Sequence, residues 1–135
     1  MSALSPTPGA ALRDEGFAVC ASSCRCGRYG RQTSAAATQA ALYTRHVVYG
    51  RELQAAVSAS RWLLGRTWGE ATASLRIENR ISPEVVKALA NASHDIELAG
   101  PLNEIMGHAG VLVRHSSGVI EGAADPRGDG VVAGF

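Results

Sequence analysis

The sequence predicts an α+β fold whose sheet is largely antiparallel. Apolar residues recur at helical spacing in some segments and gather in short strand-like runs in others. The predicted order is two helices, two strands, one helix and three strands, which is typical of a mixed α+β arrangement. A chain of 135 residues suits one domain with one core.

Two helices in tandem are predicted first. Residues 39–49 carry apolar side chains near helical spacing and then meet Gly50, a residue type that commonly ends a helix. Residues 52–59 begin with Glu52, whose negative charge interacts favourably with the helix dipole in the first turn. The second helix has one apolar stripe, made of Leu53, Ala56 and Val57.

Two short strands and a third helix follow. Residues 61–66 and 74–78 are rich in large apolar side chains and are separated by a glycine-containing join. Ser82 supplies a hydroxyl that can cap a helix, and Pro83 stands where no amide hydrogen bond is lost. A helix is therefore predicted to begin at Ser82-Pro83 and to end near residues 91–93.

The last predicted elements are a single strand and a β-hairpin. Residues 95–98 alternate between polar and apolar side chains, which is typical of a short strand. Residues 109–114 and 118–122 flank the segment His115-Ser116-Ser117-Gly118, a short turn that contains glycine. This pattern predicts two antiparallel strands joined by that turn.

Residues 1–37 differ in character from residues 38–135. No helical or strand period persists in them. Their sizeable apolar core candidates are too few to offset the entropy of ordering the segment, namely Leu12, Phe17 and Val19. We predict that residues 1–37 are disordered or unrelated to the rest, and that residues 38–135 form the folded region.

Composition and charge exclude several kinds of partner. The formal net charge is +1 at pH 7, which predicts no attraction to nucleic acid or to a membrane surface. The longest apolar runs are far shorter than the roughly 20 residues that span a bilayer. The N-terminus lacks the pattern of a secretory signal, so we expect a cytoplasmic protein.

The three cysteines, Cys20, Cys24 and Cys26, raise the question of a zinc site. Structural zinc needs four thiolate or imidazole ligands, and these cysteines are not spaced as paired Cys-x-x-Cys knuckles. The fourth ligand would have to be a distant histidine such as His46. An odd number of cysteines suits free thiols in a reducing compartment, so we predict no bound metal and no cofactor.

The remaining polar residues show no catalytic constellation. Asp125-Pro126-Arg127 is interpreted as a corner that anchors the chain, in which acid and base satisfy backbone groups or pair with each other. The four histidines have no partner at helical spacing, so hydrogen-bonded or solvated imidazoles are predicted; they are His46, His94, His108 and His115. Hydroxyls at the predicted turn, Ser116 and Ser117, commonly bond to the local backbone.

Several blocks in the second part of the chain resemble the C-terminus of the γ-glutamyltransferases. Matching residues occur in the same order over about a hundred positions and are Tyr49-Gly50, Leu53-Gln54-Ala55-Ala56, Arg61-Trp62, Gly107-His108-Ala109, Gly122, Asp125-Pro126-Arg127, Asp129-Gly130 and Gly134-Phe135. Ser60 departs from this pattern, since the family has proline before Arg-Trp. The resemblance covers the C-terminal part of the family's small subunit and ends near Thr38-Gln39.

The resemblance implies a partial αββα sandwich of the N-terminal-nucleophile hydrolases. In that family a threonine freed by self-cleavage attacks the γ-glutamyl amide of glutathione and related compounds, and a paired-glycine loop holds the oxyanion. Arg31-Gln32 stands where the glycine pair would fall. The nucleophile is expected well upstream of the matched region, so neither Thr7 nor Thr33 is assigned this role, and we assign no catalytic residue.

Three hypotheses follow for function. The first is an inactive piece of a γ-glutamyltransferase. The second is an interaction module that docks with a complementary γ-glutamyltransferase chain or associates with itself, because half of a sandwich leaves an apolar sheet face exposed. The third is a small zinc-binding regulator built on the cysteines.

Overall fold

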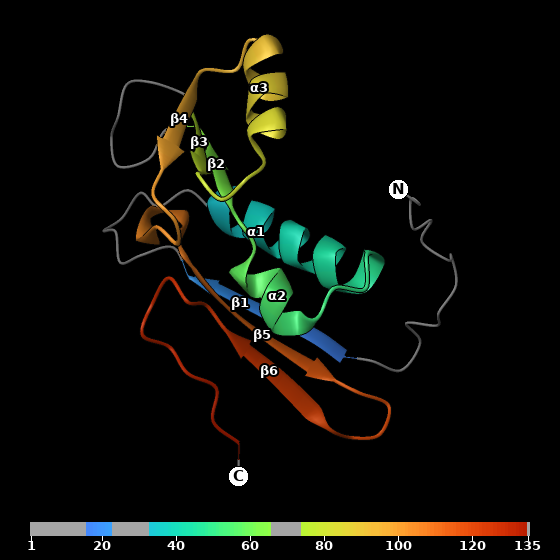
Figure 1. Cartoon of the computed structure of the whole chain (residues 1–135). Helices are drawn as coiled ribbons and strands as arrows, with labels where there is room; N and C mark the ends of the chain where they lie inside the picture. The colour runs from blue at the N-terminus through green and yellow to red at the C-terminus, as the bar shows by residue number, and fades with distance from the viewer. Residues whose placement is uncertain (1–15, 23–32, 66–73, 135) are drawn as a thin grey trace.

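The protein was analysed as a computed structural model that describes residues 16–22, 33–65 and 74–134. The described residues form two three-stranded sheets with helices packed beside them (Figure 1). This arrangement confirms the α+β class. None of the described helices has the length and apolar character that crossing a bilayer requires.

The first sheet is antiparallel throughout and has the strand order β1-β5-β6. It consists of β1 (Gly16–Ser22), β5 (His108–Arg114) and β6 (Ile120–Ala124). β5 and β6 form the predicted hairpin, in which the amide of His115 donates to the carbonyl of Val119 over 2.9 Å. Gly118 closes the turn with a positive φ of 86°, a conformation that glycine adopts without strain.

The second sheet has the order β2-β3-β4, with β2 (Trp62–Leu64), β3 (Leu75–Glu78) and β4 (Ile96–Ala99). β2 pairs with β3 in antiparallel fashion, whereas β3 and β4 are parallel. The parallel pair arises because α3 (Pro83–Asn91) connects β3 to β4 and returns the chain to the same end of the sheet. The predicted antiparallel character therefore holds for the other three of the four described strand pairs.

The helix predictions are confirmed with shifted bounds. α1 (Thr33–Tyr43) begins six residues before the predicted start at 39 and continues into a π-helical turn, η1 (Thr44–Val48). Gly50 follows with a positive φ of 63°, as expected for a helix end. α2 (Leu53–Ser58) is capped by Glu52, whose carboxylate accepts from the amides of Gln54 and Ala55 over 2.8 and 2.6 Å.

The cap predicted for α3 is present. The hydroxyl of Ser82 accepts from the amide of Glu84 over 3.3 Å, and Pro83 occupies the first helical position.

An ion pair links the two parallel strands of the second sheet. Arg76 on β3 donates from Nε to Glu97 on β4 over 2.8 Å. This hydrogen bond holds the pKa of the exposed Glu97 carboxylate below its usual value.

The hydrophobic core lies between the helices and one face of the first sheet. In Figure 1, α1 and α2 both lie across this face. Seven side chains from the helices and the sheet form this core, each with an exposed fraction of 4% or less: Leu42, Leu53, Val57, Ala109, Val111, Val113 and Ala123. Burial of these apolar groups fixes which face of the sheet turns inward.

The opposite face of this sheet is here called the outer face. By strand alternation it carries the apolar residues Gly110, Leu112, Ile120, Gly122 and Ala124, together with His108 and Arg114 at the ends of β5. Leu112 and Ile120 are 51% and 65% exposed. Val132 passes over Gly122 so closely that a Cβ at Gly122 would lie 2.5 Å from a Val132 methyl carbon. No other described strand lies on this face.

Residues 1–37 depart in part from the predicted disorder. Residues 16–22 form β1, and residues 33–37 belong to α1. β1 gains order through its backbone, which pairs with β5 from Gly16 opposite Arg114 to Ser22 opposite His108. Ladder hydrogen bonds need no large side chain, and for that reason hydrophobic content alone missed the strand. The rest of the segment, with Thr7, Arg31-Gln32, Cys24 and Cys26, lies outside the described residues, and the boundary at residue 38 stays a prediction.

Candidate functional site

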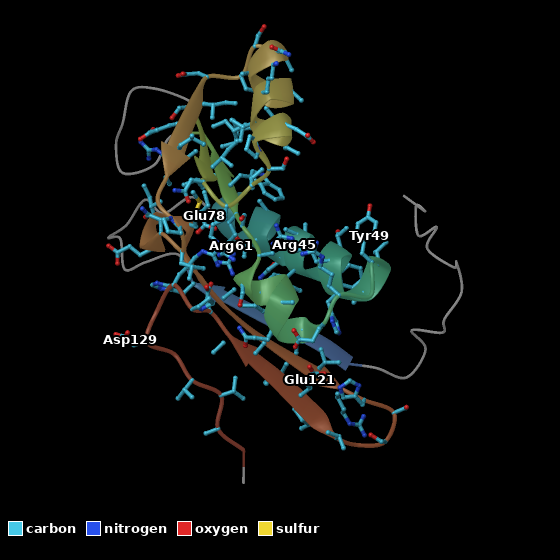
Figure 2. All side chains as sticks on the ribbon, viewed as in Figure 1. Arg45, Tyr49, Arg61, Glu78, Glu121 and Asp129 are labelled. Carbon is cyan, nitrogen blue, oxygen red and sulfur yellow. The ribbon has the colours of Figure 1, made fainter. Side chains whose placement is uncertain are left out.

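Four charged side chains form a buried cluster where the two sheets meet. Glu78 ends β3, Arg61 precedes β2, and Asp125 and Arg127 follow β6. Their exposed fractions lie between 0% and 6%. Figure 2 shows Glu78 and Arg61 side by side in the middle of the molecule, between the two sheets.

Arg127 lies at the centre of this ionic cluster. Its Nε and Nη2 atoms donate to the two carboxylate oxygens of Glu78 over 2.7 and 2.6 Å, which is the bidentate geometry of a strong arginine–carboxylate pair. Its Nη1 atom donates to Asp125 over 3.0 Å. The same guanidinium also donates to the carbonyl oxygens of Val57 and Ala59. One side chain thus joins α2, β3 and the segment after β6.

Arg61 is the second cation of the cluster. Its Nη1 atom lies 2.7 Å from a carboxylate oxygen of Asp125 and donates to the carbonyl of Gly107 over 3.0 Å. Its Nη2 atom donates to the carbonyl of Val57 over 3.3 Å. Its Nε atom is buried without a hydrogen-bond partner among the described residues. Burial lowers the pKa of Arg61, and the charge of Asp125 offsets part of that effect.

The two carboxylates are also bound to backbone amides. Glu78 accepts from the amides of Arg61 and Asn103, each over 3.1 Å. Asp125 accepts from the amides of Ala109 and Arg127 over 2.8 and 3.1 Å. With two cations and two anions, the formal charge of the cluster is zero. This matching is what makes burial of four ionised groups tolerable.

Arg127 holds a fixed positive charge at the centre of the cluster. Burial lowers the pKa of Arg127, but the hydrogen bonds and charges of Glu78 and Asp125 outweigh it, so the pKa is raised. A guanidinium does not release its proton at neutral pH. Among the described residues, the groups that accept from Arg127 are the carboxylates of Glu78 and Asp125 and the carbonyls of Val57 and Ala59. Its chemistry is that of an anchor.

The interpretation of Asp125-Pro126-Arg127 as a chain-anchoring corner is confirmed. Asp125 and Arg127 pair with each other, and both bind backbone groups of neighbouring elements. Glu78 was missed, because it was read as the end of a strand. The only trace of it in the sequence is that the strand alternates Leu75 and Ile77 with the charged Arg76 and Glu78; the structure shows that all four residues are buried.

The histidines are distributed over the fold, with hydrogen-bonded imidazoles at His46, His108 and His115 and an exposed side chain at His94. His46 bonds to the carbonyl of Arg51 over 2.7 Å, and His108 to the carbonyl of Arg127 over 3.0 Å. His115 lies 2.9 Å from a carboxylate oxygen of Glu121. The hydroxyl of Ser117 accepts from the local amide of Val119, as expected at a turn. Within the described part of the chain, no three histidine, cysteine or acidic side chains gather as metal ligands.

Comparison with solved structures shows that the fold is similar to those of γ-glutamyltranspeptidases and a related transpeptidase. The transpeptidase CapD of Bacillus anthracis superposes with a TM-score of 0.63 at 17% identity, covering 97% of this chain and 70% of that one. The family model described as gamma-glutamyltranspeptidase matches residues 27–135. The chain belongs to the γ-glutamyltranspeptidase family.

Two relatives are similar in sequence over 98 residues. The oxamate amidohydrolase proenzyme of Klebsiella pneumoniae is 49% identical, and the glutathione hydrolase-like YwrD proenzyme of Bacillus subtilis is 40% identical. Each match covers 73% of this chain. The chain spans 19% of the length of both relatives.

Replacing Arg127 tests the ionic cluster. The substitution Arg127→Met removes the cation that neutralises Glu78 and Asp125, and we expect a loss of about 3–5 kcal/mol in the free energy of unfolding. Urea denaturation followed by circular dichroism measures this loss. Asp129→Asn, an exposed change two residues away, is the matched control and leaves the midpoint unchanged. Equal midpoints for both variants would show that the cluster contributes nothing.

Proposed function

We propose that this chain forms the C-terminal structural part of an amide-hydrolysing or γ-glutamyl-transferring protein of its family, and that it has no such activity alone. The observation that carries the proposal is the 49% identity over 98 residues to a relative named as an amidohydrolase proenzyme. The described charged side chains support it, since the buried ones are held in fixed pairs. An anchor of this kind stabilises a fold and leaves the bond-breaking step to other groups.

The reaction proposed for the complete protein is attack on an amide. A threonine nucleophile from a complementary segment would add to the amide carbonyl, expel the amine and leave an acyl-enzyme, which water or an amino acid then releases. The names of the two relatives point to amides of small carboxylic acids, oxamate in one and glutathione in the other. The higher identity to the first favours oxamate-like amides over γ-glutamyl amides as the substrate class.

The proposed contribution of this chain is a docking surface. The outer face is built for close approach, because Gly110, Gly122 and Ala124 keep it flat while Leu112 and Ile120 make it apolar. Exposed apolar sheet faces of this kind favour association. The proposed occupant is the part of the family fold that the relatives carry in the remaining four fifths of their length. Such a complement would supply the second sheet of the sandwich.

A cytoplasmic location is part of the proposal. It is supported by an odd number of cysteines, which suits free thiols in a reducing compartment.

A chimaera tests the functional assignment. The 98 matching residues of the Klebsiella oxamate amidohydrolase are replaced by those of this chain, and oxamate hydrolysis is followed by ammonia release. We expect self-cleavage and activity to be retained, because the transferred residues carry the anchor and the core. The same chimaera with Arg127→Met is the control and is expected to lose both.

The 135-residue chain is assayed alone beside the chimaera, on oxamate and on a chromogenic γ-glutamyl anilide. Turnover by the isolated chain would contradict the proposal that its own residues carry no catalytic machinery. A folded chimaera that fails to cleave itself would contradict the assignment to an amide-hydrolysing protein.

Charge on the outer face tests the docking surface. We expect the isolated chain to self-associate in size-exclusion chromatography, since Leu112 and Ile120 on its outer face are exposed. The double variant Leu112→Glu and Ile120→Glu should shift the chain toward the monomer, because burying two carboxylates in an interface is unfavourable. Leu64→Glu, at an exposed position of the other sheet, is the matched control. A monomeric unmodified chain would contradict this role for the outer face.

A further inference from the structure

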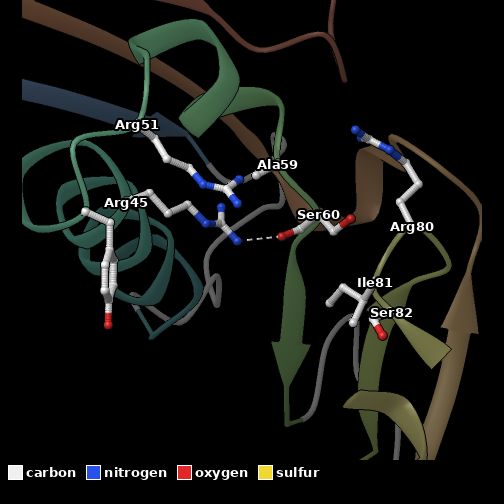
Figure 3. A pocket seen from close by; sticks show the side chains of 8 residues that line it. Arg45, Arg51, Ala59, Ser60, Arg80, Ile81 and Ser82 are labelled. Atoms are coloured by element: carbon white, nitrogen blue, oxygen red, sulfur yellow. Dashed lines mark hydrogen bonds between the residues drawn. The ribbon is translucent and has the colours of Figure 1, made fainter. Parts of the chain in front are cut away.

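A pocket of about 500 Å³ opens between the η1–α2 connection and the loop from β3 to α3. Figure 3 shows Arg45 and Arg51 on one wall, with their guanidinium groups turned toward each other, and Arg80 on the opposite wall. Ser60 lies between the two walls. None of the lining residues belongs to the ionic cluster, so this pocket is separate from the anchor and from the proposed function.

The charges of the pocket are all of one sign. Its lining includes three arginines and no acidic side chain. Among the described residues, no ion pair involves Arg45, Arg51 or Arg80. Glu52, the neighbour of Arg51 in sequence, already uses both carboxylate oxygens to cap α2, and Glu78, whose charge acts on Arg45, is paired with Arg127 in the ionic cluster. The pocket therefore concentrates positive charge that the described part of the chain does not neutralise.

Two of the three arginines are held in place by uncharged groups. Arg45 donates from Nη2 to the carbonyl of Ser60 over 2.6 Å, and its guanidinium lies 5.8 Å from the ring centroid of Trp62. Arg80 donates from Nη1 to the carbonyl of Ser58 over 2.9 Å. Partial burial lowers the pKa of Arg45, and the charges of Arg61 and Arg51 lower it further.

These contacts preorganise cationic donors without satisfying their charge. A guanidinium has five N–H donors, and hydrogen bonds to described residues use two of those of Arg45 and one of those of Arg80. Planar guanidinium groups match the geometry of phosphate and carboxylate oxygens. The volume of the pocket falls within the range of small-molecule sites, roughly 300–1,000 Å³.

We propose that this pocket is a binding site for a small polyanion that carries phosphate or carboxylate groups. The residues that bind the polyanion are Arg45, Arg51 and Arg80. Arg45 and Arg51 hold one anionic group from their shared wall. Arg80 holds a second group from the opposite wall.

Binding is measured by isothermal titration calorimetry on the full chain with two probes, pyrophosphate for the phosphate class and citrate for the carboxylate class. All titrations are made at equal ionic strength adjusted with sodium chloride. We expect saturable binding of at least one probe, and the probe that binds more tightly identifies the class. For Arg51→Gln and for Arg80→Gln we expect the dissociation constant to rise at least about tenfold, which is the effect of losing one charge-assisted hydrogen bond.

Arg114→Gln is the matched control, because Arg114 is an exposed arginine on β5 that does not line the pocket. Its affinity should equal that of the unmodified chain. Circular dichroism verifies that each variant is folded, which both exposed positions permit. Absence of binding by both probes, or equal weakening by Arg114→Gln, would overturn the proposal. Unchanged affinity in the double variant Arg51→Gln and Arg80→Gln would overturn it as well.

Discussion

The pair formed by Arg127 and Glu78 is the constraint on which the rest of the structure depends. Glu78 belongs to the second sheet, while Arg127 follows the last strand of the first. The residues are 49 positions apart in the chain, and both side chains are fully buried. Because the two ions lose their hydration on folding, the cluster is favourable only when every member is in place. The two sheets are thereby required to form together.

The same constraint supports the proposal that the buried charges take no part in catalysis. General acid–base catalysis needs a group whose proton can move near neutral pH. In the cluster, each carboxylate oxygen faces a guanidinium or a backbone amide, and Arg127 has a raised pKa. The ionic cluster therefore stabilises the fold. Under the proposed function, a complementary segment carries out the bond-breaking chemistry and docks on the outer face of the first sheet.

Local sequence patterns predicted much of the fold. They did not predict the pairings between residues that are distant in sequence. Ser82 and Gly118 act through neighbours in sequence, and the cap of α3 and the hairpin turn were predicted from them; Glu52 was predicted as a residue of the first helical turn and caps α2 instead. Strand β1 pairs through its backbone, and the parallel pairing of β3 with β4 depends on how α3 returns. Asp125 and Arg127 signalled an anchor, but their partner Glu78 could be found only once strand β3 was placed. The arginines of the pocket likewise come together only in the folded chain.

A double-mutant cycle between Glu78 and Arg127 tests most directly whether this pair couples the two sheets. The free energy of unfolding is measured for the unmodified chain, Glu78→Gln, Arg127→Met and the double variant. The account predicts that the two effects are strongly non-additive, with a coupling of about 1–3 kcal/mol, because the second substitution removes a charge that the first left unpaired. Additive effects, within about 0.5 kcal/mol, would contradict it.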